Sequence, residues 1–277
     1  MTAPHASTGY FRSGLPYNRL GRGPRPLVVI QGLMFENRPQ PGFMVRMYAF
    51  LNGRFTTYVV LRRPGLPQGY TLRDMADDYA AMIREEFGGP VDVIGVSTGG
   101  SIAQHFAADH PDLVRRLVIH SSAYVLSDAA KRLQLRVGEL ARECEWTKAW
   151  SLLIGAMVPR RGVMGHLHGP TVWAGSQLMG WLAAPTDPSD LLVTIEAEDR
   201  HDFRERLAEI AAPTLVVAGA EDPFYSEALF RDTAAGIPDA RLILYPAMGH
   251  PASGKQFSRD ILAFLSEDVP HPRHPGP

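Results

Sequence analysis

The sequence contains a single cysteine, Cys144, among its 277 residues. A disulfide needs a second cysteine, and a thiolate zinc site needs further cysteine ligands, so both are excluded. The surrounding segment, ARECEWTKAW, has a helical pattern, and we expect Cys144 to occupy an ordinary structural position on that helix. The folded chain must therefore be stabilised by a hydrophobic core, and 45% of its residues are hydrophobic, which is sufficient for one.

An excess of charge of either sign is also absent. Lys and Arg together number 28 and Asp and Glu 29, so no global field attracts nucleic acid or an anionic membrane, and neither is expected as a partner. No run approaches the ~18 uninterrupted apolar residues of a membrane-spanning helix, and the N-terminal MTAPHASTGYFRSG does not resemble a secretory signal. We expect a cytoplasmic protein, monomer or homodimer, whose partner is a small-molecule substrate.

Short runs rich in Val, Ile and Leu recur along the chain and have the composition of buried strands. They are PLVVIQG at 26–32, TYVVLRR at 57–63, VDVIGVS at 91–97, RLVIHSS at 116–122, PTLVVAG at 213–219 and RLILYPA at 241–247. Helical patterns lie between several of these runs, and in one of them Thr71 and Asp74 have the spacing of a capping box. The alternation predicts an α/β fold, a doubly wound, mostly parallel sheet with helices on both faces.

This alternation breaks between residues 124 and 190, a stretch without a convincing strand. Its long helical pattern predicts an inserted helical cap, which leaves residues 1–123 and 191–265 as the core. The Pro-rich end of the sequence cannot sustain a helix or strand, and we expect residues 266–277 to form a disordered tail.

The predicted cap is rich in large apolar side chains, including Trp173, Trp181, Met164 and Met179. Aromatic rings and thioethers offer wide, adaptable surfaces that can line a substrate pocket. They can equally pack a cap onto its core, and we favour packing for each of these residues individually.

One turn stands out as chemically suggestive. The segment from Gly95 to Gly99 reads G-V-S-T-G between a predicted strand and a predicted helix, the context in which a G-x-S-x-G motif presents a nucleophilic serine. Small neighbours such as Gly100 let strand and helix approach closely, and the following helix N-terminus favours developing negative charge. Ser97 is therefore the candidate nucleophile.

A serine is a weak nucleophile unless a base lies within hydrogen-bond reach. Of the ten histidines, His250 follows the last predicted strand, at the carboxyl edge where parallel sheets build active sites. Asp222 follows the preceding strand, next to Pro223, and a carboxylate there would fix the imidazole tautomer. Glu221 is the nearest competitor, with a side chain expected to face elsewhere. Ser97, Asp222 and His250 are the predicted catalytic residues.

Acyl transfer also needs two amide donors for the oxygen of its tetrahedral intermediate. Thr98, which follows the nucleophile, is expected to provide one. The other is expected from Leu33, because the flexible Gly32 before it lets that amide turn inward.

In order, spacing and context, these motifs resemble the α/β-hydrolase family from about Leu27 to Leu265. The resemblance implies an eight-stranded sheet with the nucleophile after strand five, the acid after strand seven, the histidine after strand eight and a cap inserted after strand six. It further implies a serine hydrolase that cleaves a carboxylic ester or thioester of a small hydrophobic substrate through an acyl-enzyme on Ser97. No metal or organic cofactor is expected.

The sequence departs from the common family pattern at two places. Gln31 stands where many relatives carry a histidine before the glycine, and Arg63 precedes Pro-Gly where many carry an aspartate. We expect Arg62 and Arg63 to lie near the carboxyl edge, available to an anionic substrate group but more simply explained by surface ion pairs. The same scaffold also supports lyases, perhydrolases, acyltransferases and non-catalytic binding proteins, which remain the alternatives.

Overall fold

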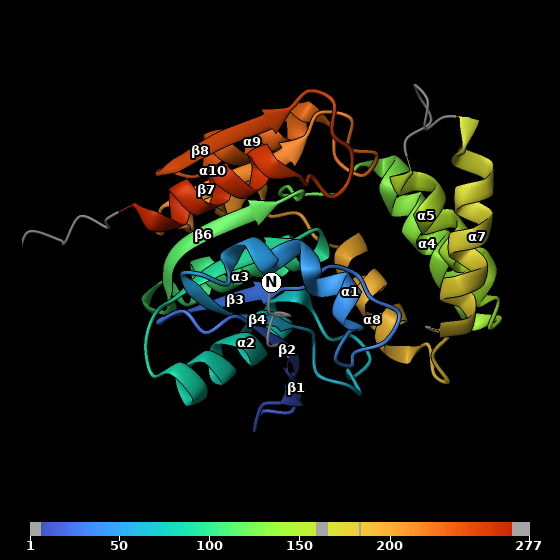
Figure 1. Ribbon diagram of the computed structural model, residues 1–277, viewed down its shortest axis with the longest axis horizontal. Coiled ribbons are helices and arrows are strands. Elements are labelled where there is room, and N and C mark those ends of the chain that lie inside the picture. The colour runs from blue at the N-terminus through green and yellow to red at the C-terminus, as the bar shows by residue number, and fades with distance from the viewer. Residues whose placement is uncertain (1–6, 159–165, 183, 268–277) are drawn as a thin grey trace, which may run out of the picture.

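The computed structural model describes residues 7–158, 166–182 and 184–267, and its centre is an eight-stranded sheet (Figure 1). The strands are β1 (Ser7–Tyr10), β2 (Pro16–Leu20), β3 (Arg25–Ile30), β4 (Phe55–Val60), β5 (Val91–Val96), β6 (Val114–His120), β7 (Thr214–Gly219) and β8 (Ala240–Tyr245). Their spatial order is β1-β2-β4-β3-β5-β6-β7-β8. From β4 to β8 every pairing is parallel, and only β1 and β2 run antiparallel to their neighbours, which confirms the predicted fold class.

Nine α-helices and three short 3₁₀ helices accompany the sheet among the described residues. The α-helices are α1 (Gly42–Val45), α2 (Leu72–Phe87), α3 (Thr98–Asp109), α4 (Asp128–Arg142), α5 (Trp146–Met157), α7 (His168–Leu182), α8 (Ser189–Asp199), α9 (Glu227–Gly236) and α10 (Lys255–Ser266). The 3₁₀ helices are η1 (Arg46–Leu51), η2 (Pro111–Leu113) and η3 (Arg204–Glu209). The capping box predicted for α2 is confirmed, since Thr71 Oγ1 accepts from the Asp74 amide while the Asp74 side chain accepts from the Thr71 amide.

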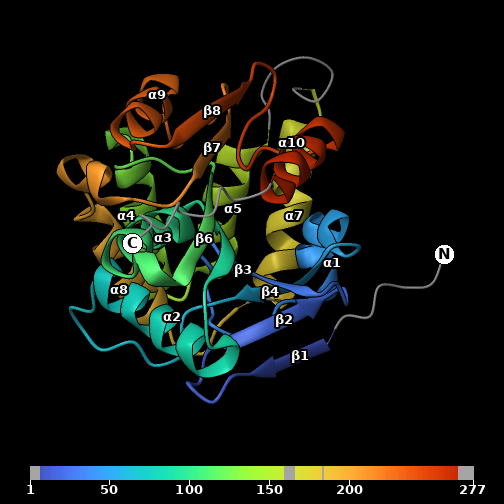
Figure 2. The same ribbon diagram turned by 90° about the vertical axis from the view of Figure 1, so that its left-hand side faces the viewer.

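Both faces of the sheet are covered, because side chains alternate between two hydrophobic clusters along each strand. On β3, Val28 and Ile30 join the cluster that contains the apolar sides of α2, α3 and α9. Leu27 and Val29 point the other way, into a cluster with η1 and α10. Figure 2 shows these two helical layers on opposite sides of the twisted sheet. The buried sheet fixes where each strand ends, and therefore where the loops at its carboxyl edge meet.

Helices α4, α5 and α7 are the described part of the predicted cap and are called the cap below. They stand apart from the sheet at the right of Figure 1, beyond the carboxyl ends of the strands. Between residues 124 and 190 no strand occurs in the described part of the chain. Helix α8 begins at Ser189 and returns to the core, packing on α4 and α2. Of the predicted tail, Ser266 still belongs to α10, while the stretch from 268 onward is outside the described residues, as is Met164.

The expectation that Cys144 lies within a helix is wrong. It is an exposed residue at φ +57° in the turn between α4 and α5. Its amide donates to Ala141 O and the next amide, of Glu145, donates to Leu140 O, which is the Schellman pattern of a helix end. Hydrophobic periodicity runs through this segment because both helices present apolar faces, so the pattern conceals the break.

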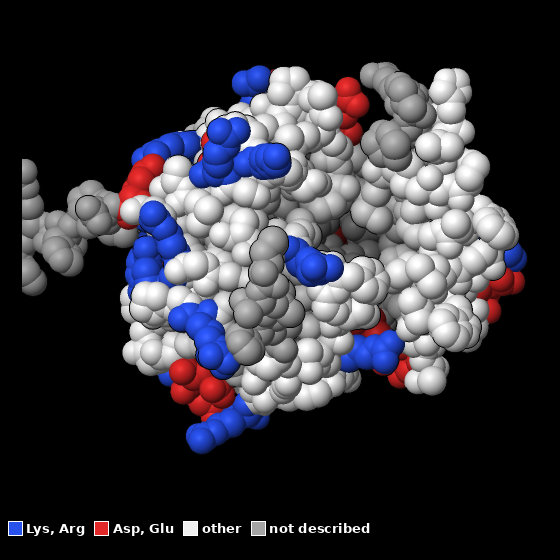
Figure 3. All heavy atoms as spheres, in the orientation of Figure 1, with Lys and Arg blue, Asp and Glu red and all other residues white. Residues whose placement is uncertain are grey.

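Several apolar side chains of the cap face solvent. Trp173 and Trp181 are 67% and 80% exposed, so packing onto the core does not account for them, whereas Met179 is packed against the main hydrophobic cluster. Figure 3 shows the cap surface as mostly uncharged, with charged side chains gathered mainly over the core. None of the described helices is both long and apolar enough to cross a membrane.

Candidate active site

Ser97 lies in a sharp turn between β5 and α3. Its φ of 52° and ψ of −128° are strained for a residue with a side chain. The turn is possible because Gly99 lies against the end of β3: a Cβ there would come 2.1 Å from Ile30 O, closer than any carbon tolerates. This backbone conformation directs the Ser97 side chain out of the turn between strand and helix, as the motif predicts.

His250 lies in the loop after β8, and this loop is bound to the end of β6. Ser121 Oγ accepts from the Ala252 amide at 3.0 Å, and His120 Nε2 donates to Ala252 O at 2.8 Å. Burial lowers the pKa of His120 to about 3, which keeps its ring neutral and able to donate from one nitrogen. The two bonds hold the backbone two residues beyond His250 and so restrict the position of its ring.

Asp222 lies in the turn after β7, and its carboxylate is oriented by backbone amides. Oδ1 accepts from the amides of Phe224 at 2.8 Å and Tyr225 at 3.2 Å. This leaves Oδ2 for the imidazole, since a carboxylate bound on one oxygen by two amides cannot rotate freely. The ring of Phe224 also packs on that of His250, with centroids 4.6 Å apart.

The structure brings the three predicted residues into one hydrogen-bonded chain. His250 Nδ1 lies 2.7 Å from Asp222 Oδ2, and His250 Nε2 lies 3.1 Å from Ser97 Oγ. The side chains of His250 and Asp222 are 6% and 0% exposed, so solvent does not compete strongly for these bonds. In this arrangement the imidazole can accept the serine proton while the carboxylate stabilises the resulting imidazolium.

The two predicted oxyanion donors belong to separate segments, Thr98 to the start of α3 and Leu33 to the loop after β3. Thr98 is the first residue of α3, where a backbone amide has no acceptor within the helix. Gly32 lies directly against the nucleophile, since a Cβ on it would be 3.2 Å from Ser97 Cβ and 3.1 Å from Val96 O. Leu33, the next residue, donates its amide to no described backbone acceptor. Neither amide has a backbone acceptor among the described residues, and both stay the predicted donors.

Arg62 and Arg63 differ in their surroundings. Arg63 forms the expected surface pair, with Nε 3.3 Å from Asp78 Oδ2. For Arg62 the expectation of a surface ion pair or an exposed anion site is wrong, because its side chain is 1% exposed. It donates instead to the carbonyl oxygens of Gln31 and Gly32, both at 3.1 Å. Strand β4 ends at Val60, and the turn that follows it places Arg62 against the loop after β3.

A cavity of about 250 Å³ opens beside Ser97 and His250, between the core and the cap. Its apolar wall contains Met34, Met44, Met47, Trp150, Leu153 and Met157. In the described part of the chain, its lining contains no Asp, Glu, Lys or Arg. The titratable groups that line it are the His250 imidazole and the Tyr48 hydroxyl. The cavity therefore suits an uncharged, largely apolar ligand.

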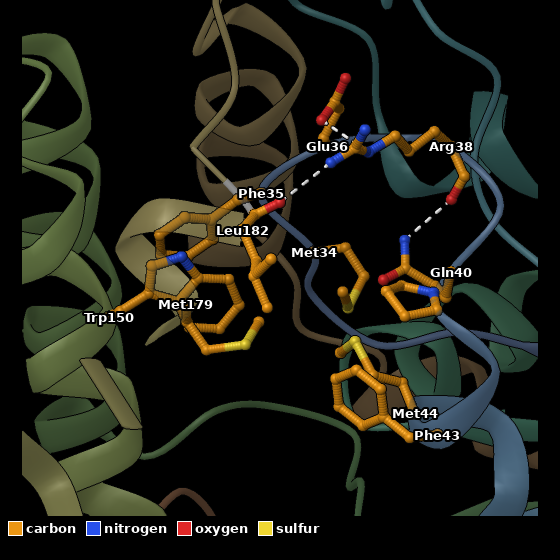
Figure 4. A pocket seen from close by; sticks show the side chains of 11 residues that line it. Met34, Phe35, Glu36, Arg38, Gln40, Phe43, Met44, Trp150, Met179 and Leu182 are labelled. Carbon is orange, nitrogen blue, oxygen red and sulfur yellow. Dashed lines mark hydrogen bonds and ion pairs between the residues drawn. The ribbon is translucent and has the colours of Figure 1, made fainter. Parts of the chain in front are cut away.

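A smaller cavity of about 30 Å³ adjoins it on the side of the cap. Figure 4 shows Trp150, Met179 and Leu182 from the cap facing Met34 and Met44 of the core across this space. Among the described residues, Met34, Met44 and Trp150 line both cavities.

Comparison with known proteins identifies the family. A protein-family model described as the alpha/beta hydrolase fold matches residues 61–254, more than half of the chain. The chain belongs to the α/β-hydrolase family. This α/β hydrolase is 27% identical to 2-(acetamidomethylene)succinate hydrolase of Mesorhizobium japonicum over 236 residues, 83% of each chain. It is also 28% identical to pimeloyl-[acyl-carrier protein] methyl ester esterase of Chromobacterium violaceum over 257 residues, 90% of this chain and 96% of the relative.

Solved structures agree in fold. A hydrolase from Pseudomonas aeruginosa superposes with a TM-score of 0.76 at 23% identity, covering 95% of this chain and 99% of that one. The α/β hydrolase MGS-M2, from a deep-sea metagenome library of the Medee basin, gives 0.77 at 19% identity, covering 97% and 100%. The family and its hydrolase relatives support a hydrolase of this fold.

Sequence reasoning missed a buried polar group behind the site of this α/β hydrolase. Glu198 of α8 is fully buried, and its Oε1 accepts from Ser101 Oγ of α3 at 2.8 Å. Burial raises the pKa of Glu198 to about 7, although Ser101 and Arg62 oppose that shift. Glu198 belongs to a charged segment that also contains Glu196 and Asp199, so nothing in the local sequence marks its side chain as buried. In the described part of the chain, no group of three or more His, Cys, Asp or Glu side chains could hold a metal ion.

Proposed function

We propose that the protein is a serine hydrolase that cleaves an ester bond, carboxylic or thioester, of a small uncharged substrate through an acyl-enzyme on Ser97. The observation that carries this proposal is the hydrogen-bonded chain from Asp222 through His250 to Ser97 Oγ, at 2.7 and 3.1 Å. Membership of the α/β-hydrolase family and similarity to a methyl ester esterase add support.

The reaction follows from which atoms face one another. His250 Nε2 takes the proton of Ser97 as Oγ attacks the carbonyl carbon, and Asp222 stabilises the imidazolium. The amides of Thr98 and Leu33 stabilise the negative oxygen of the tetrahedral intermediate. The imidazolium then protonates the leaving alcohol or thiol, and water, deprotonated by His250, releases the acid from Ser97.

The cavity supports a neutral acyl group. A carboxylate moved into an apolar wall without a cationic partner carries a large desolvation cost, and the described lining offers no Lys or Arg. The relative named for a succinate derivative acts on a dicarboxylate, so the substrate proposed here differs from that one in charge.

The nucleophile is tested with a panel of p-nitrophenyl esters of increasing acyl length, assayed on the wild type and on Ser97→Ala in parallel. The proposal expects hydrolysis to be abolished by the substitution across the panel. Full activity in purified Ser97→Ala would overturn it. Labelling of Ser97 by a fluorophosphonate is also expected, because a non-catalytic binding protein would have no activated serine to react.

Charge selectivity has its own test. We compare p-nitrophenyl hexanoate with the p-nitrophenyl monoester of adipic acid, which ends in a carboxylate where hexanoate ends in a methyl group. The neutral ester is expected to have the higher kcat/KM, by roughly tenfold or more. Equal values would contradict the uncharged substrate but not the role of Ser97 as nucleophile.

Assays with a cyanohydrin distinguish a hydrolase from a lyase. The proposed hydrolase is expected to release no aldehyde, whereas a lyase would release it.

A further inference from the structure

Arg62 is among the largest fully buried side chains of the molecule, at 1% exposure. Burying a guanidinium is costly unless its N–H groups find acceptors. Two of its nitrogens donate to consecutive carbonyls of the loop after β3, NH1 to Gln31 O and NH2 to Gly32 O, each at 3.1 Å. A planar fork that binds two successive carbonyls fixes the direction of both peptide units.

The second of those carbonyls shares a peptide unit with the amide of Leu33. This peptide is trans, since the only cis bond among the described residues joins His250 to Pro251. In a trans peptide the C=O and the N–H point in opposite directions. With Gly32 O directed at Arg62, the Leu33 N–H must therefore point away from Arg62. Gly32 itself lies against Ser97, so this places a backbone donor beside the nucleophile.

Glycine makes that orientation easy to lose. A peptide unit that follows a glycine can rotate with little steric hindrance, because no Cβ restricts it. A rotated Gly32–Leu33 peptide would direct a carbonyl oxygen, in place of an N–H, toward the site of the developing oxyanion. The partial negative charge of that carbonyl oxygen would then repel the oxyanion where the reaction needs a donor.

The guanidinium of Arg62 has no direct ion pair among the described residues. Burial lowers the pKa of Arg62, and this shift is opposed by Tyr79 and, from opposite ends of α8, by Glu198 and Asp190. Asp190 also accepts from the amides of Gly65 at 3.1 Å and Leu66 at 2.8 Å. Helix α8 thereby holds the turn that carries Arg62.

We propose that Arg62 is a positioning residue that holds the Gly32–Leu33 peptide with its N–H toward the oxyanion. Arg62 does not touch the substrate and acts only through this loop. The inference rests on the proposed function, because an oxyanion arises only if an acyl group is transferred to Ser97.

The test replaces Arg62 with methionine, which has similar length and no donor. Removing one oxyanion donor slows an enzyme by roughly 100-fold or more, so kcat of Arg62→Met is expected to fall by about 100-fold, with KM changed by no more than about 3-fold. The inhibition constant of an alkylboronic acid, which forms a tetrahedral adduct with the serine, is expected to rise by a similar factor. A merely structural role would reduce the fraction of active enzyme without changing that constant.

Two further variants complete the design. Arg63→Met is the matched control, since Arg63 lies next in the chain but its side chain pairs with Asp78 and covers the Tyr70 ring, and it is expected to keep wild-type kcat. Arg62→Lys retains the charge, but an ammonium lacks the planar fork that donates to two carbonyls at once. Its kcat is therefore expected to lie between those of wild type and Arg62→Met. It also provides the measurement if Arg62→Met fails to fold.

Wild-type kcat and boronate affinity in a folded Arg62→Met or Arg62→Lys protein would overturn this role. The outcome is distinguishable from failure of the proposed function. If Ser97→Ala is inactive while Arg62→Met is fully active, only the positioning role is wrong. If Ser97→Ala is active, the proposed function itself is wrong.

Discussion

Asp222 carries two kinds of hydrogen bond on its two carboxylate oxygens, and they can be separated by a single substitution. In Asp222→Asn the amide oxygen still accepts from the Phe224 and Tyr225 amides, so the turn is expected to keep its shape. The new NH₂ group faces His250 Nδ1 and selects the wrong imidazole tautomer. We expect kcat to fall by about 10³ to 10⁴-fold. The measurement is ester hydrolysis together with circular dichroism, and near-wild-type kcat would contradict the role of Asp222.

Glu198 offers a prediction about stability and pH. Burial raises its pKa to about 7 in the folded protein from the ordinary 4.5, so between these values the unfolded chain ionises while the folded one keeps its proton. The contribution of Glu198 to stability is therefore present below pH 4.5 and lost as pH rises through 7. Its total size is on the order of 3 kcal/mol.

Glu198→Gln removes this titration. The free energy of unfolding of the wild type, measured by urea titration relative to that of the variant, is expected to decline between pH 4.5 and 7. All other titrating groups are common to both proteins, so the difference isolates Glu198. Parallel stability profiles would show that its carboxyl has an ordinary pKa.

Single elements are where the sequence was most informative. The apolar runs predicted β3 to β8, because a strand buried on both faces must be apolar throughout. The G-x-S-x-G motif predicted the turn at Ser97 for a local steric reason, visible in the contact that a Cβ on Gly99 would make with Ile30 O. The break at Cys144 could not be predicted, because the hydrogen bonds that end α4 involve backbone atoms that any residue supplies.

Helix α2 provides a test of element stability that does not involve the site. Thr71→Ala removes the oxygen that accepts from the Asp74 amide and the hydroxyl that donates to the Asp74 carboxylate. Loss of such a cap is expected to lower the free energy of unfolding by about 1 kcal/mol. Because α2 contributes no residue to the cavity beside Ser97, kcat is expected to be unchanged. A large loss of kcat would indicate coupling between α2 and the site.

At the scale of the whole molecule, prediction was limited by contacts between distant segments. Ser97, Asp222 and His250 could be chosen because each follows a strand, and parallel strands end at one edge. Arg62 has no such signal: its role depends on the β3 loop passing above it, and its charge balance depends on α8, more than a hundred residues later. Likewise the exposed Trp173 and the buried Trp150 belong to the same apolar cap, and only the fold separates them.

Trp150 joins the cap to the core, stacking on Phe35 with ring centroids 4.1 Å apart at 25°. It also lines both cavities, as Met34 and Met44 do, and Figure 4 shows it beside the smaller one. Truncation to alanine is expected to connect the two spaces, so that Trp150→Ala accepts longer acyl chains than the wild type does. The lost packing is expected to reduce the free energy of unfolding by about 3 kcal/mol or more.

The p-nitrophenyl ester panel measures this change as a shift in the chain length with the highest kcat/KM. Trp173→Ala is the matched control, because Trp173 is 67% exposed and lines neither cavity. The same truncation is expected there to leave the chain-length profile unchanged and the stability nearly so. If the two alanine variants have identical profiles, Trp150 does not limit the acyl chain, and the selectivity must come from the core side of the cavity.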